Sequence, residues 1–186
     1  INLQSLRADY NKPLRPRDLN GIRGPIVGFV GNLTSLYTSA NMIHRVAREH
    51  PQTSVVLVGN EDRSFTSHTL HLLPNVFFLG AKKTDQLVHY VQNFDVLINP
   101  MSINELTDVN YSPVIDLALA MGKPVVSMRN NSLSLLGRYV HLADSEDDFS
   151  RAVSLALKEV DNKDLSEYRR AFAESLNVEL CAERFY

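Results

Sequence analysis

Short apolar runs alternate with amphipathic stretches along the chain from residue 25 onward. Each run is rich in Val, Ile, Leu or Phe and lacks the strict polar alternation of a half-exposed strand. Runs that are apolar on both faces, each followed by a helical period, indicate a parallel sheet that is covered on both sides. The predicted strands are residues 25–30, 54–58, 75–79, 95–99, 124–127 and a weaker 139–142.

Between these runs, apolar residues recur at the spacing of a helix face. The stretch before His50-Pro51 has Met42, Ile43 and Val46 in step, and similar periods occur before the runs at 95–99 and 124–127. The C-terminal third carries two more helical faces, around 149–160 and 168–172. We therefore expect an α/β fold: a doubly wound, mainly parallel, six-stranded Rossmann-like sheet with helices on both faces and extra C-terminal helices.

The overall composition fits one soluble domain. The chain has 186 residues and a net charge of −2, which gives no global reason to bind nucleic acid. No apolar run is long enough for a membrane helix, and the single cysteine, Cys181, excludes an internal disulfide. Residues 1–24 are predicted to form a linker or arm, and residues 25–186 the domain.

In a doubly wound sheet, ligands bind at the carboxyl ends of the strands, near the point where the strand order reverses. This rule selects candidate residues before any function is considered. The candidates are Gly31 to Thr34, Gly59 to Glu61, Gly80, and Pro100 to Asn110.

Several functions lack the residues that they need. Gly28 and Gly31 do not form the G-x-G-x-x-G pattern of a nicotinamide site, although a turn at Gly31-Asn32 suits a phosphate. His68 and His71 have no nearby third ligand, so we expect no metal site. The G-x-S-x-G elbow of hydrolases is absent, and the acidic residues of a receiver domain are missing.

The most informative stretch is residues 104–113 (NELTDVNYSP), which concentrates polar groups between a strand and a helix. Free N–H groups at a helix start suit a diphosphate or sugar hydroxyls. The alternative is a loop whose Asn and Asp side chains only cap turns. Within it we expect Glu105 to be exposed, with its carboxylate toward the crevice, and Leu106 to anchor the loop in the core.

The order of four segments resembles the C-terminal, donor-binding domain of GT-B fold glycosyltransferases, especially the retaining group that uses nucleotide-diphosphate sugars. The resemblance covers nearly the whole chain and implies an N-terminal acceptor-binding domain outside it. The segments are IVGFVGNLTSLY, HPQTSVVLVGNE, LPNVFFLGAKKTDQLVHYVQNFDVLINP and NELTDVNYSPVIDLALAMGKPVVS.

The resemblance also implies roles for individual residues. Gly31 and Asn32 correspond to the loop near the donor diphosphate, and Gly59 and Asn60 to the loop that approaches the nucleotide. Glu105 corresponds to the acidic residue that faces the sugar and is the expected catalytic residue. Backbone amides around Leu106 and Thr107 correspond to phosphate contacts.

The chain departs from the family pattern at two positions on the predicted helix 113–121. Leu117 occupies the place of a glutamate that binds the ribose, and Val114 the place of a base that neutralises phosphate. Asp116 can replace the glutamate only if the helix shifts register, because one residue rotates about 100°. Lys82, Lys83 or Arg63 are candidates to replace the base.

We therefore expect the donor-binding part of a glycosyltransferase that uses a nucleotide-diphosphate sugar, inactive as an isolated domain and needing no cofactor or metal. One alternative is a degenerate, non-catalytic domain that acts as an interaction or glycan-binding module. A third is a nucleotide-sugar epimerase of the same fold. The expected location is the cytoplasm, with contact to the inner face of a membrane through the absent domain left open.

Overall fold

A computed structural model describes residues 14–182, and the side chains of residues 14–176. It contains one six-stranded sheet in the order β3-β2-β1-β4-β5-β6, and every neighbouring pair of these strands is parallel. The doubly wound fold is therefore confirmed. The strands are β1 (Ile26–Val30), β2 (Ser54–Val58), β3 (Val76–Phe78), β4 (Val96–Asn99), β5 (Val125–Met128) and β6 (His141–Ala143).

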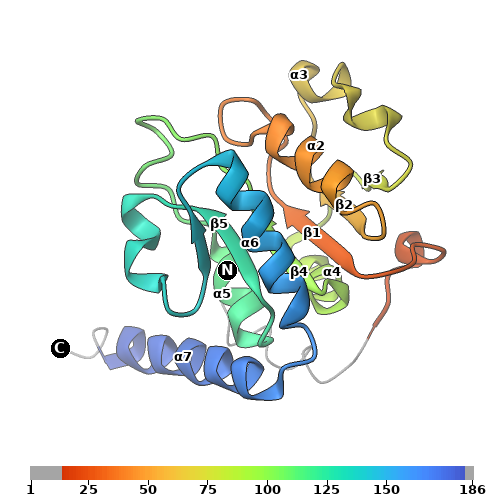
Figure 1. Ribbon diagram of the computed structural model, residues 1–186. Helices are drawn as coiled ribbons and strands as arrows, with labels where there is room; N and C mark the ends of the chain where they lie inside the picture. Colours follow the sequence, from red (N-terminus) through yellow and green to blue (C-terminus); the bar gives the residue numbers. More distant parts are fainter. Residues whose placement is uncertain (1–13, 183–186) are drawn as a thin grey trace.

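Helices cover both faces of the sheet. In Figure 1, α2 and α6 lie in front of the strands, α4 and α5 lie behind them, and α7 packs beneath α5. The helices are α2 (Ala40–Glu49), α3 (Arg63–Thr66), α4 (Leu87–Asn93), α5 (Pro113–Ala120), α6 (Glu146–Lys158) and α7 (Lys163–Ala182). The short 3-10 turns are η1 (Arg17–Leu19), η2 (Thr69–Leu72), η3 (Thr84–Gln86) and η4 (Asn131–Leu136).

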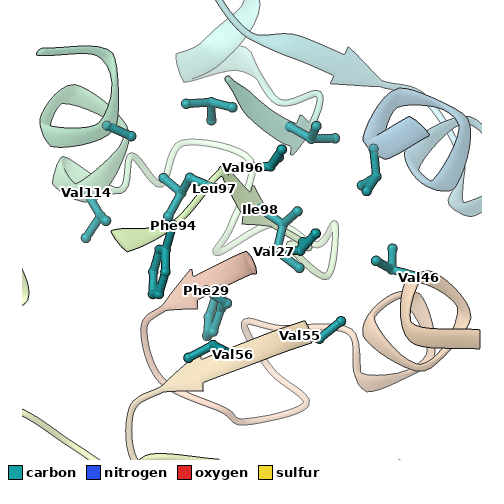
Figure 2. Packing of buried hydrophobic residues seen from close by; sticks show 14 of the residues in the cluster. Val27, Phe29, Val46, Val55, Val56, Phe94, Val96, Leu97, Ile98 and Val114 are labelled. Carbon is teal, nitrogen blue, oxygen red and sulfur yellow. The ribbon is translucent and has the colours of Figure 1, made fainter. Parts of the chain in front are cut away.

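The apolar runs form strands because their side chains are buried on both faces of the sheet. All five residues of β2 are buried, as a central parallel strand requires. Figure 2 shows the consequence: Val46 of α2 packs on one side of the strands, and Phe94 and Val114 pack on the other. The core is thus split into two layers by the sheet.

The end of the predicted arm packs against this domain. Leu19 is fully buried and Ile22 nearly so, and Arg15 donates hydrogen bonds to the carbonyls of both residues. The Tyr90 hydroxyl donates to Asp18, which also pairs with Lys82 at 2.8 Å. Residues 14–24 therefore pack beside α4 and form part of the folded domain.

Candidate functional site

A cleft of about 460 Å³ opens at the carboxyl ends of β1 and β4. In the observed strand order the chain leaves β1 toward β2 on one side, and leaves β4 toward β5 on the other. The loops after these two strands therefore diverge, which is the geometry expected at a switch point. The cleft is lined by Phe29, Val30, Gly31, Asn32, Tyr37, Thr38, Asn99, Met101, Leu106, Asn110 and Ser112.

One wall of the cleft is the loop that follows β1. Gly31 N–H donates to the Val58 carbonyl at 3.0 Å, and Leu33 N–H donates to the Asn60 carbonyl at 2.9 Å. A Cβ atom at Gly59 would lie 1.7 Å from the Gly31 carbonyl oxygen. Gly59 and Asn60 therefore support this wall from behind, whereas Gly31 and Asn32 line the cleft itself.

The opposite wall is the loop between β4 and α5, residues 100–112, which we call the β4–α5 loop. The Asn104 side-chain oxygen accepts from the N–H groups of Leu106 and Thr107 at 3.0 and 3.1 Å, and its amide donates to the Leu36 carbonyl at 2.8 Å. Asn104 thus shapes a turn in this loop and ties it to the wall that follows β1.

Asn130, just after β5, holds the same loop from below. Its side chain is 4% exposed, and its amide group donates to the carbonyls of Thr107 and Asn110 at 2.9 and 2.8 Å. Its oxygen accepts from Leu133 N–H at 2.9 Å. These bonds satisfy polar groups of the loop and tie it to the end of β5.

The expected orientation of Leu106 is wrong. Leu106 is 61% exposed and faces the cleft, whereas Thr107 is fully buried. The Thr107 hydroxyl accepts from Asn104 N–H at 2.9 Å and donates to the Ser102 carbonyl, so the burial of this polar group is compensated. The turn at Asn104 leaves Leu106 outside. Glu105 is exposed, as expected, but is not among the residues that line the cleft.

The start of α5 forms the floor near Ser112, whose side chain makes no capping hydrogen bond. Leu117 is fully buried and Val114 is nearly so, and both lie in the hydrophobic core. Asp116, in the first turn of α5, is half-buried and accepts a hydrogen bond from the Tyr111 hydroxyl. Burial raises the pKa of the Asp116 carboxyl, and the Tyr111 hydrogen bond offsets this only in part.

Asp116→Asn is expected to stabilise the protein increasingly as the pH rises above about 4. Burial raises the pKa of Asp116 in the folded state. The wild-type carboxyl therefore adds to the free energy of unfolding fully below its unfolded pKa, roughly 3.9, and this gain is lost as the pH rises through the folded pKa. Urea titrations at several pH values measure the free energy of unfolding of both proteins. A difference that stays constant with pH would contradict this expectation. Tyr111→Phe should move the transition to higher pH.

The basic residues proposed to replace a missing phosphate contact do not line the cleft. Lys82 is paired with Asp18, Arg63 is exposed at the start of α3, and Lys83 is exposed in the loop after β3. His68 caps η2 by accepting from Leu70 N–H, while His71 pairs with Glu61 at 2.8 Å. Across the part of the chain that the structure describes, no group of three or more His, Cys, Asp or Glu side chains is arranged to hold a metal ion.

Some residues of the cleft lay outside the sequence prediction. Asn99 is the last residue of β4, and Tyr37 and Thr38 belong to the loop before α2. The rule that ligands bind at the carboxyl ends of the strands also selects Asn99, if the last residue of each strand is counted as a candidate. No sequence signal identifies Asn130, which lies 20 and 23 positions from the carbonyls that its amide group binds.

Known proteins share this sequence pattern and fold. A family model described as "Glycosyl transferases group 1" matches residues 24–159. TuaH of Bacillus subtilis (strain 168), whose name ascribes it to teichuronic acid biosynthesis as a glycosyltransferase, is 29% identical over 163 residues, 83% of this chain and 40% of TuaH.

Two solved structures have the same fold. HepE of Anabaena in complex with UDP matches with a TM-score of 0.68 and 18% identity, over 87% of this chain and 48% of HepE. Sucrose-phosphate synthase from Thermosynechococcus elongatus matches with a TM-score of 0.69 and 17% identity, over 98% of this chain and 48% of that protein. The chain thus spans less than half the length of each of these relatives. In the part of the chain that the structure describes, no helix is both long and apolar enough to cross a bilayer.

Proposed function

Because the chain belongs to the glycosyl transferases group 1 family, we propose that its cleft binds the nucleotide-diphosphate sugar from which a glycosyltransferase takes a sugar. The observation that carries this proposal is the position of the cleft at the switch point between β1 and β4. The structurally similar HepE binds UDP in its crystal structure, which supports a nucleotide donor here.

The proposal assigns residues 25–186 to donor binding and residues 1–24 to an arm. The acceptor would bind to a second domain, which corresponds to the part of the longer relatives that this chain does not cover. Gly31, Asn32 and Leu106 would contact the donor directly, because they line the cleft. Gly59, Asn60 and Thr107 would act through the backbone that they hold in place.

The chemistry proposed for this site is electrostatic. When the sugar leaves, negative charge develops on the diphosphate, and donors that are already oriented stabilise it without reorganisation. Within the β4–α5 loop, the N–H groups of Leu106 and Thr107 already donate to the Asn104 side-chain oxygen, so the donors that stabilise this charge would be other groups. Asp116 is a candidate for the ribose contact, since it is half-buried in the first turn of α5, just after Ser112, which lines the cleft; its carboxyl is bonded to the Tyr111 hydroxyl.

Calorimetric titration of UDP and GDP into the chain tests the proposal. We expect weak binding of at least one of them, with NMR shift changes at Gly31, Asn32 and Leu106. Shift changes confined to the amino edge of the sheet, near Gln52, or none at millimolar nucleotide, would contradict the proposal. Restoring a glutamate at Leu117 is not an informative test, because Leu117 is fully buried and the variant would bury a charge.

Glu105→Gln is expected to lower the activity of the full-length enzyme at least about tenfold, or about 1.4 kcal/mol of transition-state stabilisation. Because Glu105 is exposed, the free energy of unfolding should change by no more than about 0.5 kcal/mol. Steady-state kinetics and urea titration measure the two effects. Loss of stability with unchanged turnover would assign Glu105 to loop architecture and remove the proposed role facing the sugar.

A non-catalytic, glycan-binding domain is the second candidate, and a specific observation favours it. None of the side chains that line the cleft is charged, and Leu117 and Val114 are buried where the family pattern has an acid and a base. Binding of a neutral oligosaccharide in the cleft, together with no binding of any nucleotide, would favour this candidate over the first.

A further inference from the structure

We infer that the cleft recognises only the uncharged parts of the donor, its nucleoside and sugar, and that the cations facing the diphosphate come from another part of the protein. This other part corresponds to the segment of the longer relatives that the chain does not cover, which is more than half of their length. This inference rests on the proposed function. It states which groups of the donor this chain would bind and which groups the remaining segment would bind.

The charges around the cleft have the wrong sign for a diphosphate. The loop from Gly31 to Ser39 contains no charged residue. The β4–α5 loop contains Glu105 and Asp108 but no Lys or Arg. Neither carboxylate belongs to a residue that lines the cleft, but a diphosphate placed between these walls would still meet no side-chain cation from either loop.

The N-terminus of α5 does not supply the missing positive charge. Pro113 at the first helical position has no N–H group, and Ile115 N–H is already bonded to the Ser112 carbonyl at 2.9 Å. Asp116 places a carboxyl group in the same first turn. A helix N-terminus carries only about half a positive charge. With no N–H at the first position and a carboxyl group in the first turn, the N-terminus of α5 is a poor site for a dianion.

The basic residues of the neighbouring loops are paired or distant. Arg129, after β5, pairs with Asp144 at 2.6 Å, and Lys82 pairs with Asp18 at 2.8 Å. Arg63 follows Glu61 and Asp62, so its loop is net negative. Lys83 follows the edge strand β3, two strands from β1 and hence about 10 Å away. Within residues 14–176, none of these groups is positioned at the cleft.

The lining of the cleft is instead suited to a neutral polyhydroxyl ligand. Amide and hydroxyl side chains come from Asn32, Thr38, Asn99, Asn110 and Ser112. Such groups both donate and accept hydrogen bonds, as sugar hydroxyls do. Tyr37, 40% exposed at the rim, adds an aromatic surface. The cleft therefore has the chemistry for a nucleoside and a sugar, but not for the phosphates between them.

Titration of uridine and UDP into the 186-residue chain, with EDTA present, tests the first half of the inference. We expect UDP to bind less than tenfold more tightly than uridine, with an affinity that changes less than threefold between low and high salt. A ratio of tenfold or more, or a larger salt effect, would overturn the inference and leave the proposed function intact. If neither compound binds, the same comparison is made with guanosine and GDP; if none of the four binds, the proposed function fails, and the inference fails with it.

A charge-adding pair of variants tests whether the cleft is the binding site. Asn110→Lys puts a cation at the cleft wall, where Asn110 is exposed and contributes its backbone carbonyl, not its side chain, to the bond with Asn130. It should raise the preference for UDP over uridine at least fivefold. The matched control, Gln52→Lys, is exposed at the opposite edge of the sheet and should leave the preference unchanged. Equal effects of both variants would contradict this location.

The full-length protein tests the second half. With the remaining segment present, UDP should bind at least tenfold more tightly than uridine, and salt should weaken that preference. A full-length protein with the same small preference as the 186-residue chain would show that no cation comes from the remaining segment, and would overturn the inference.

Discussion

Gly59→Ala should lower the free energy of unfolding by at least about 3 kcal/mol, because the new methyl group cannot be accommodated. The added Cβ would lie 1.7 Å from the Gly31 carbonyl oxygen and 2.8 Å from its carbon. Both are backbone atoms of the strand end beside it, so no side-chain rotation relieves the clash. The ends of β1 and β2 would have to separate, which breaks the hydrogen bond from Gly31 N–H to Val58. Urea-induced unfolding measures the loss.

Gly80→Ala is the matched control for this variant. Gly80 also ends a strand segment and has a positive φ of 68°, but nothing lies within 4 Å of its Cβ position. Only the backbone conformation is then strained, at a cost of about 1–2 kcal/mol. If the two variants lost equal stability, the close approach of Gly59 to Gly31 would not be the reason for glycine at this position. The Gly59 variant should also move the wall of the cleft, and so weaken nucleotide binding.

Asn130→Ala should cost about 2–4 kcal/mol of unfolding free energy and weaken nucleotide binding at least tenfold. The substitution leaves the buried carbonyl of Thr107 without its partner and frees that of Asn110. The Leu133 N–H loses its side-chain acceptor and keeps only the longer bond to the Asn130 backbone carbonyl, at 3.3 Å. The bonds between Asn131 and Asp108 then remain to hold the β4–α5 loop to the segment after β5, so Leu106 and Asn110 are less well fixed in the cleft. Urea titration and calorimetry measure the two effects.

Asn75→Ala separates the effect on the site from the effect on stability. The Asn75 amide likewise donates to backbone carbonyls, those of Ala47 and Thr53 at 2.9 and 3.1 Å. Asn75 directly precedes β3, so it lies at the amino edge of the sheet, away from the cleft. This variant should lose comparable stability but keep its affinity for nucleotide. An equal loss of affinity in both variants would mean that destabilisation alone weakens binding.

Local sequence was enough to predict the strands. The runs at 54–58 and 95–99 match β2 and β4 to within one residue, because a strand buried on both faces must be apolar throughout. The position of the crevice also followed, since strand order and helix crossovers in such folds bring the carboxyl ends together. Gly31 and Asn32 line the cleft for this reason.

Side-chain direction within the β4–α5 loop was decided by tertiary contacts. Hydrophobicity favoured Leu106 as the buried residue, yet Thr107 is buried and Leu106 is 61% exposed. The reversal occurs because Asn104 turns the loop and Asn130 holds it from a different strand end. The Asn104 bond is local, but the bonds from the Asn130 amide have no local signature, since the carbonyls that accept them lie at least 20 positions away along the chain.

The sequence by itself determined the fold class, the edge of the sheet at which the cleft opens, and the absence of charged residues between Gly31 and Ser39. These properties follow from residue type and chain order, which are local quantities. Only the tertiary structure decided that Leu117 is in the core, that Asp116 pairs with Tyr111, and that Lys82 is taken by Asp18. The physical reason is that burial and pairing depend on which distant segments pack together, and so on the whole sheet rather than on any one loop.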